Sequence, residues 1–126
     1  MLRHSVVIIT LLAAVSSLAA GCGFRSSTPP PADGPNWQHV MMSEVNEWRR
    51  ANGLAPLAWC GTLSHGAQGH SYFQAATNQM VHSNVGALAS AYGYTPWSAL
   101  AENVAYGYSG ARDVVHAWLN SPGHRH

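Results

Sequence analysis

The sequence predicts a mostly helical domain of the α+β class. Residues 37–52 and 111–119 carry apolar side chains at helical spacing, and the apolar run Asn103–Tyr108 is typical of a short strand. Charged residues make up only 9% of the chain, with Lys+Arg 6, Asp+Glu 5 and a net charge of +1. Because nucleic-acid binding requires clustered Lys and Arg, the composition argues against a nucleic-acid partner.

The segment 37–52 predicts the best-defined helix. Asn36 is a suitable N-cap, and Gly53 suits the position just past the last turn. Residues 54–60 contain Pro56 and therefore predict a loop or a short extended piece.

Two further helical segments are expected in the middle of the chain. Thr62 is a candidate cap for a helix that runs to about Asn78. Gly66 and Gly69 weaken this prediction, because each glycine costs about 1 kcal/mol in a helix interior. Residues 88–92 predict a single helical turn before the next breaks.

The last helix is predicted over residues 111–119, with Ser109 as its cap. Pro122 cannot continue a helix, so the segment ends before it. The apolar positions of this helix are Ala111, Val114, Val115, Trp118 and Leu119.

Residues 1–21 predict a lipoprotein-type signal peptide. Arg3 precedes the uncharged run Val6–Ala20, which is too short for a spanning helix of about 20 residues. The small residues before Cys22 resemble a bacterial lipobox, so we expect Cys22 to carry a lipid anchor. The alternative is ordinary signal cleavage near Ala20.

The leader and the segment after it predict a domain held at the membrane. Residues 22–36 are rich in Ser and Pro and predict a tether, which leaves residues 37–126 as the folded domain. The expected location is the extracytoplasmic side of the cell membrane, with secretion as the alternative. If Cys22 is lipidated, Cys60 remains as an odd cysteine, either a free thiol or one without its partner.

His82, Glu102 and His124 are the candidate site residues, because each stands in or beside a predicted loop. Two histidines and a carboxylate suit a divalent metal or acid–base chemistry. Spacing alone does not single out these three, and each has a structural reading. His82 can cap a helix end, Glu102 can lie in a turn, and His124 can belong to a tail. The chain has no HExxH motif, and Gly107–Ala111 misses GxSxG at its last position.

Four motifs in order resemble the CAP superfamily, which comprises cysteine-rich secretory, antigen 5 and pathogenesis-related 1 proteins. The last block matches the bacterial branch, and the resemblance runs from about Trp37 to the last residue. The motifs are Asn46-x-x-Arg49 with Gly53-Leu54, Pro56-Leu57 and Trp59; Leu63-x-x-x-Ala67 with His82-Ser83; Ala101-Glu102-Asn103-Val104-Ala105-x-Gly107; and Trp118-x-x-Ser121-Pro122-Gly123-His124-Arg125.

The resemblance implies an α/β/α sandwich with a surface cleft, in which His82, Glu102 and His124 could hold a divalent cation, with zinc the first candidate. Ser121 stands where the family usually has a second Glu. The family pattern continues beyond His126 into closing strands. We therefore expect a truncated domain, mostly helices with the closing sheet strands missing, in which Cys60 has lost its partner.

The first functional hypothesis is a non-enzymatic binding domain for a small molecule or lipid. An aromatic stretch could line a lipid or sterol groove, although ordinary packing also explains it. The first alternative is a metal-dependent hydrolase or peptidase, which the absence of a protease motif disfavours. The second alternative is a non-functional truncated remnant. The aromatic residues are Tyr92, Tyr94, Trp97, Tyr106 and Tyr108.

Overall fold

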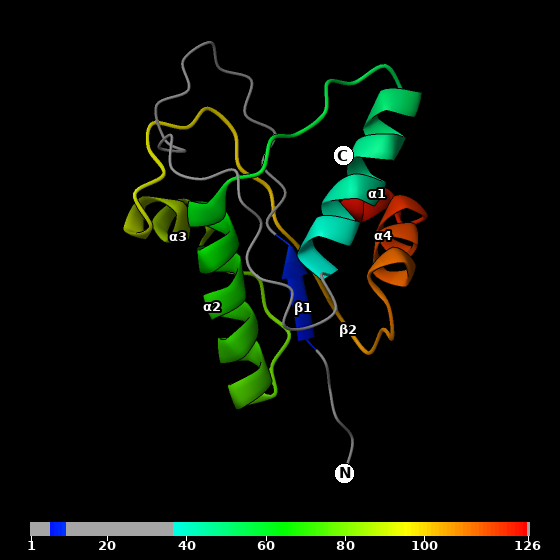
Figure 1. The fold of residues 1–126 in the computed structure, drawn as a ribbon. Coiled ribbons are helices and arrows are strands. Elements are labelled where there is room, and N and C mark those ends of the chain that lie inside the picture. Colours follow the sequence, from blue (N-terminus) through cyan, green and yellow to red (C-terminus); the bar gives the residue numbers. More distant parts are fainter. Residues whose placement is uncertain (1–5, 10–36, 126) are drawn as a thin grey trace. The chain divides into compact units, whose positions relative to one another are not determined.

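The computed structural model describes residues 6–9 and 37–125 of the chain. The predicted tether, residues 22–36, and the predicted lipidation residue, Cys22, therefore lie outside the described part. The described part is mostly helical and contains one short two-stranded sheet, which confirms the α+β class (Figure 1). Over these residues, no helix has the length and hydropathy that a membrane crossing requires.

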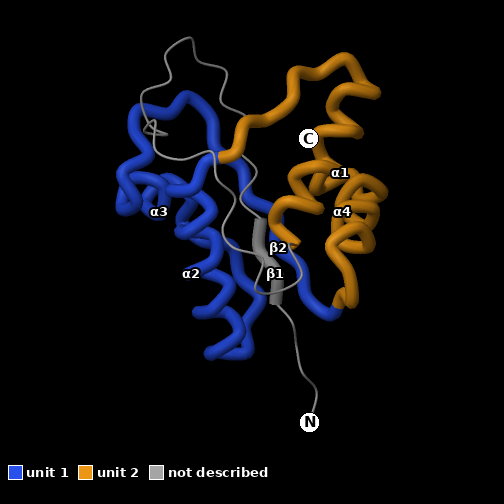
Figure 2. The backbone as a smooth tube through the Cα atoms, viewed as in Figure 1, with its two compact units in different colours: residues 1–25, 60–107 blue, residues 26–59, 108–126 orange. Residues whose placement is uncertain are grey.

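The chain divides into two compact units, each built from two stretches of sequence (Figure 2). Unit 1 contains residues 1–25 and 60–107, and unit 2 contains residues 26–59 and 108–126. Candidate site residues occur in both units, so each unit is described by itself.

In unit 2, helix α1 spans Trp37–Ala51, as predicted to within one residue. Gly53 follows it with φ +72°, a conformation that glycine adopts without strain. The Leu54 N–H donates to the Arg49 carbonyl at 2.8 Å, and the Gly53 N–H donates to the Arg50 carbonyl at 3.1 Å. This pair of bonds is a Schellman motif and satisfies carbonyls at the helix end.

Helix α1 packs against α4 (Ala111–Leu119), which is the predicted last helix. The predicted cap Ser109 is wrong by one residue, since Gly110 is the N-cap. The Gly110 backbone is extended, and no side chain caps the helix start. The short 3-10 helix η1 (Pro122–His124) follows α4. The buried apolar side chains of the two α-helices are Met41, Val45, Ala111, Val114, Val115 and Trp118.

In unit 1, helix α2 spans Gly61–Thr77 and ends at Asn78, which has φ 53°. The predicted cap Thr62 is wrong by two residues, because the helix begins at Gly61 and the extended Cys60 is its N-cap. Cys60 is disulfide-bonded, so the expectation of a free or partnerless thiol is also wrong.

Helix α3 spans Val85–Ala91 and begins earlier than the predicted turn. Asn84 caps it, since its Oδ1 accepts from the Ala87 N–H at 3.0 Å. Tyr92, just past α3, lies against α2: a Cβ on Gly69 would stand 3.1 Å from the Tyr92 hydroxyl oxygen, and one on Gly66 3.3 Å from the ring. The two glycines, unfavourable as helix formers, therefore allow α2 to accept the tyrosine.

Strand β2 (Asn103–Tyr106) is shorter than predicted and ends just before Gly107, which has φ +83°. It pairs antiparallel with β1 (Val6–Ile9), with Val6 opposite Tyr106. Strand β1 falls within the segment predicted as a signal peptide, and removal of that segment from the mature chain stays a prediction.

Candidate functional site

Two of the three predicted site residues, His82 and Glu102, lie together in unit 1. His82 belongs to the irregular segment between α2 and α3, and Glu102 directly precedes β2. The His82 Nδ1 is 2.9 Å from the Glu102 Oε2, within hydrogen-bond distance. The two residues are 20 positions apart in the sequence, and the chain brings them together where it runs back from α3 to β2.

The Glu102 carboxylate is almost completely buried, with 1% of its side chain exposed. Ser83 donates to it twice: its backbone N–H reaches Oε2 at 2.8 Å, and its hydroxyl reaches Oε1 at 2.8 Å. A buried carboxylate is costly unless hydrogen bonds replace the water it has lost. Ser83 and His82 together supply those bonds, so the carboxylate has a defined orientation.

The same contact determines which ring nitrogen of His82 faces outward. An ionised carboxylate only accepts hydrogen bonds, so the His82 Nδ1 carries the hydrogen that points at Glu102. A neutral imidazole then carries its lone pair on Nε2. The His82 side chain is 60% exposed, and no residue of the described part bonds its Nε2. In this neutral form, His82 presents a nitrogen lone pair to the solvent.

The structure adds His70 of α2 to this group. Its Nε2 is 2.8 Å from the Val81 carbonyl oxygen and 4.0 Å from the Glu102 Oε1, and its side chain is 10% exposed. His70 is not among the site residues predicted from the sequence. Its spacing from His82 carries no motif that could have identified it, because the contact depends on how the segment after α2 folds back.

The third predicted residue, His124, belongs to η1 in unit 2. Its Nδ1 is 2.7 Å from the hydroxyl oxygen of Ser121, the residue at the place of the family's second Glu. Among the residues for which the structure gives positions, no three His, Cys, Asp or Glu side chains form a set that could hold a metal ion. The three-residue cation site therefore stays a prediction.

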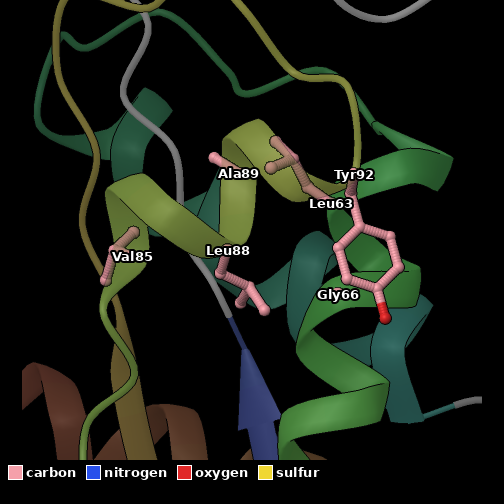
Figure 3. A pocket seen from close by; sticks show the side chains of 6 residues that line it. All are labelled: Leu63, Gly66, Val85, Leu88, Ala89 and Tyr92. Carbon is pink, nitrogen blue, oxygen red and sulfur yellow. The ribbon is translucent and has the colours of Figure 1, made fainter.

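A small apolar pocket lies between α2 and α3 in unit 1 (Figure 3). Its volume of ≈ 10 Å³ is at the lower limit for one water molecule. Tyr92, from the predicted aromatic stretch, closes one side of it over α2 (Figure 3). The residues that line the pocket are Leu63, Gly66, Val85, Leu88, Ala89 and Tyr92.

The pair formed by Glu102 and His82 can support two kinds of chemistry. A carboxylate that accepts from one ring nitrogen of a histidine orients the other nitrogen toward a metal ion. The same arrangement also holds a histidine in the tautomer that a general base requires. Both uses need the exposed Nε2 of His82, with Glu102 behind the ring.

Comparison with known proteins agrees with the motifs. No curated protein and no solved structure matches the chain. The model of the CAP family, described as the cysteine-rich secretory protein family, matches residues 42–126, more than half of the chain. Because that match includes the segments that carry His82, Glu102 and His124, the chain belongs to the CAP superfamily.

Proposed function

We propose that this CAP protein is a non-enzymatic, extracytoplasmic binding domain whose cleft holds a divalent cation, with zinc the first candidate. The observation that carries the proposal is the His82–Glu102 contact, 2.9 Å long and backed by a buried carboxylate. Zinc sites in proteins use imidazole nitrogens, and their histidines are usually oriented by a carboxylate or carbonyl on the other ring nitrogen.

The residues have different roles in this proposal. His82 is the ligand, through Nε2. Glu102 is an orienting partner rather than a ligand, because its oxygens accept from His82 and Ser83 and its side chain is 1% exposed. His124 is proposed as a second ligand on the family resemblance alone. A single imidazole is only one ligand, so a site of ordinary coordination needs further nitrogen or oxygen donors.

Zinc titration of the full chain tests the proposal. Zinc at about 100 times its dissociation constant should stabilise the folded chain by about 2.7 kcal/mol and raise its melting temperature. His82→Ala should abolish this rise. His65→Ala is the matched control, because His65 is an exposed histidine on α2. His124→Ala should weaken the response if it is the second ligand.

Two outcomes would contradict the cation site. One is a cooperative melt that zinc does not change. The other is an equal loss of the zinc response in the His65 and His82 variants. A chain without any cooperative melt would instead favour the non-functional remnant.

A metal-dependent hydrolase is the second candidate, because the Glu102–His82 pair also suits a general base. Incubation with casein and cell-wall peptides, with and without a chelator, distinguishes the two functions. Chelator-sensitive turnover that is lost in His82→Ala, a variant that keeps the buried Glu102 carboxylate and its bonds from Ser83, would establish hydrolysis over simple binding.

The proposed location is the outer face of the membrane, with a lipid at Cys22. The disulfide of Cys60 supports an oxidising compartment. Mass spectrometry of the mature N-terminus tests the anchor. A lipid mass on Cys22 is expected, and a Cys22 without a lipid would overturn the anchor.

A lipid or sterol is the proposed organic ligand. Tyr92 and its apolar neighbours offer the surface for it, although the pocket of ≈ 10 Å³ would have to open by movement of Tyr92. Binding of a fluorescent sterol by the full chain, compared with Tyr92→Ala, tests this part of the proposal. Equal binding by both proteins would place the ligand elsewhere.

A further inference from the structure

We propose that His70 is a positioning residue for His82: by holding the Val81 carbonyl, it keeps the segment that carries His82 against Glu102. This inference rests on the proposed function in one respect, namely that the exposed nitrogen of His82 is the group that binds. The contacts that carry the inference all lie within unit 1.

The His70 ring is held in place on α2. A carbonyl oxygen only accepts, so the His70 Nε2, 2.8 Å from the Val81 oxygen, carries the hydrogen of this bond. The ring also stacks on Phe73 one helical turn away, with centroids 5.9 Å apart and planes inclined by 13°. The His70 side chain is only 10% exposed and its Nε2 is hydrogen-bonded, so the ring is held in one orientation.

The segment that His70 holds has no regular structure of its own. Residues 79–84 belong to no helix or strand, so hydrogen bonds within an element do not define their course. The bond from His70 to Val81 lies on one side of His82, and the bond from the Ser83 N–H to Glu102 lies on the other. His82 is therefore placed between two anchored neighbours.

Glu102 connects the two histidines. The His70 Nε2 is 4.0 Å from the Glu102 Oε1, too far for a hydrogen bond but close enough for the N–H dipole to favour the carboxylate. The carboxylate thus has His82 bonded to one oxygen and His70 near the other. Loss of the His70 N–H should loosen both Val81 and the environment of Glu102, and through them the orientation of His82.

Two variants separate a positioning role from simple packing. His70→Gln retains a side-chain N–H that can reach the Val81 carbonyl. His70→Leu fills a similar volume without a donor. His65→Leu is the matched control, since it changes an exposed histidine of the same helix. All variants are made in the full chain.

The first measurement is the tautomer of His82, read from the ¹⁵N shifts of its two ring nitrogens in the metal-free protein. The parent, His70→Gln and His65→Leu should show hydrogen on Nδ1, and His70→Leu should show a mixture of the two tautomers. The second measurement is zinc affinity by calorimetry. His70→Leu should bind zinc about tenfold more weakly, the lower end of the effect of residues behind a metal ligand. His70→Gln should stay close to the parent.

An unchanged His82 tautomer in His70→Leu would overturn the inference. Equal losses in His70→Leu and His70→Gln would also overturn it, because they would show that only the shape of the ring matters. If the parent binds no zinc, the proposed cation site fails, and the tautomer measurement still decides the role of His70.

Discussion

Replacement of Glu102 should destabilise unit 1 more than loss of any exposed charge in the chain. Its carboxylate accepts three hydrogen bonds, at 2.8, 2.8 and 2.9 Å, with 1% of its side chain exposed. A hydrogen bond to a charged group contributes about 1.5–3 kcal/mol. The two bonds from Ser83 dominate, because the exposed His82 can bond water instead. Glu102→Ala should therefore lower the free energy of unfolding by about 3–5 kcal/mol.

Glu102→Gln should cost much less than Glu102→Ala. The amide oxygen can still accept from the Ser83 N–H and from His82, and the amide NH₂ can donate to the Ser83 hydroxyl once that hydroxyl turns. What is lost is the charge, which roughly doubles the strength of such bonds. The expected loss of stability is about 1–2 kcal/mol.

Urea denaturation measures both losses, and hydrogen exchange at the Ser83 amide measures the effect locally. This amide should exchange faster in Glu102→Ala than in Glu102→Gln, since only the second retains an acceptor. Glu47→Ala is the control, because Glu47 is an exposed carboxylate of α1. The reasoning is refuted if Glu102→Ala is no less stable than Glu47→Ala, or if alanine and glutamine at position 102 have equal effects.

Two further predictions concern unit 2, and denaturant melts monitored by tryptophan fluorescence check both. Asn46→Ala should cost about 2 kcal/mol, because the buried amide donates to the Leu57 carbonyl at 3.0 Å and accepts from the Leu57 N–H at 2.7 Å. A loss below about 0.5 kcal/mol would mean that water replaces both bonds. Gly53→Ala should cost about 1–2 kcal/mol through its φ of +72° alone, since nothing lies within 4 Å of the added Cβ. An unchanged midpoint would show that the turn relaxes.

Local sequence signals were sufficient for most elements. The apolar spacing of α1 and α4 and the glycine after α1 act within one or two turns of chain, so they can be read without knowledge of the fold. Predicted caps were less accurate. Thr62 and Ser109 have good capping side chains, yet Cys60 and Gly110 take those positions. At both helix starts the N-cap has an extended backbone and no side-chain cap bond, so a capping preference of about 1 kcal/mol did not decide where the helix begins.

For the candidate site, too, some features could be predicted from the sequence and others only from the tertiary structure. Motif order and residue type predicted His82 and Glu102 as site residues and identified the superfamily, because these are properties of the linear chain. Only the tertiary structure placed the Glu102 carboxylate behind His82, with the exposed nitrogen outward, and brought His70 to the Val81 carbonyl. These contacts join residues 11 to 20 positions apart through an irregular segment. Hydrogen bonds formed on folding determine its course, and no periodic pattern in the sequence encodes them.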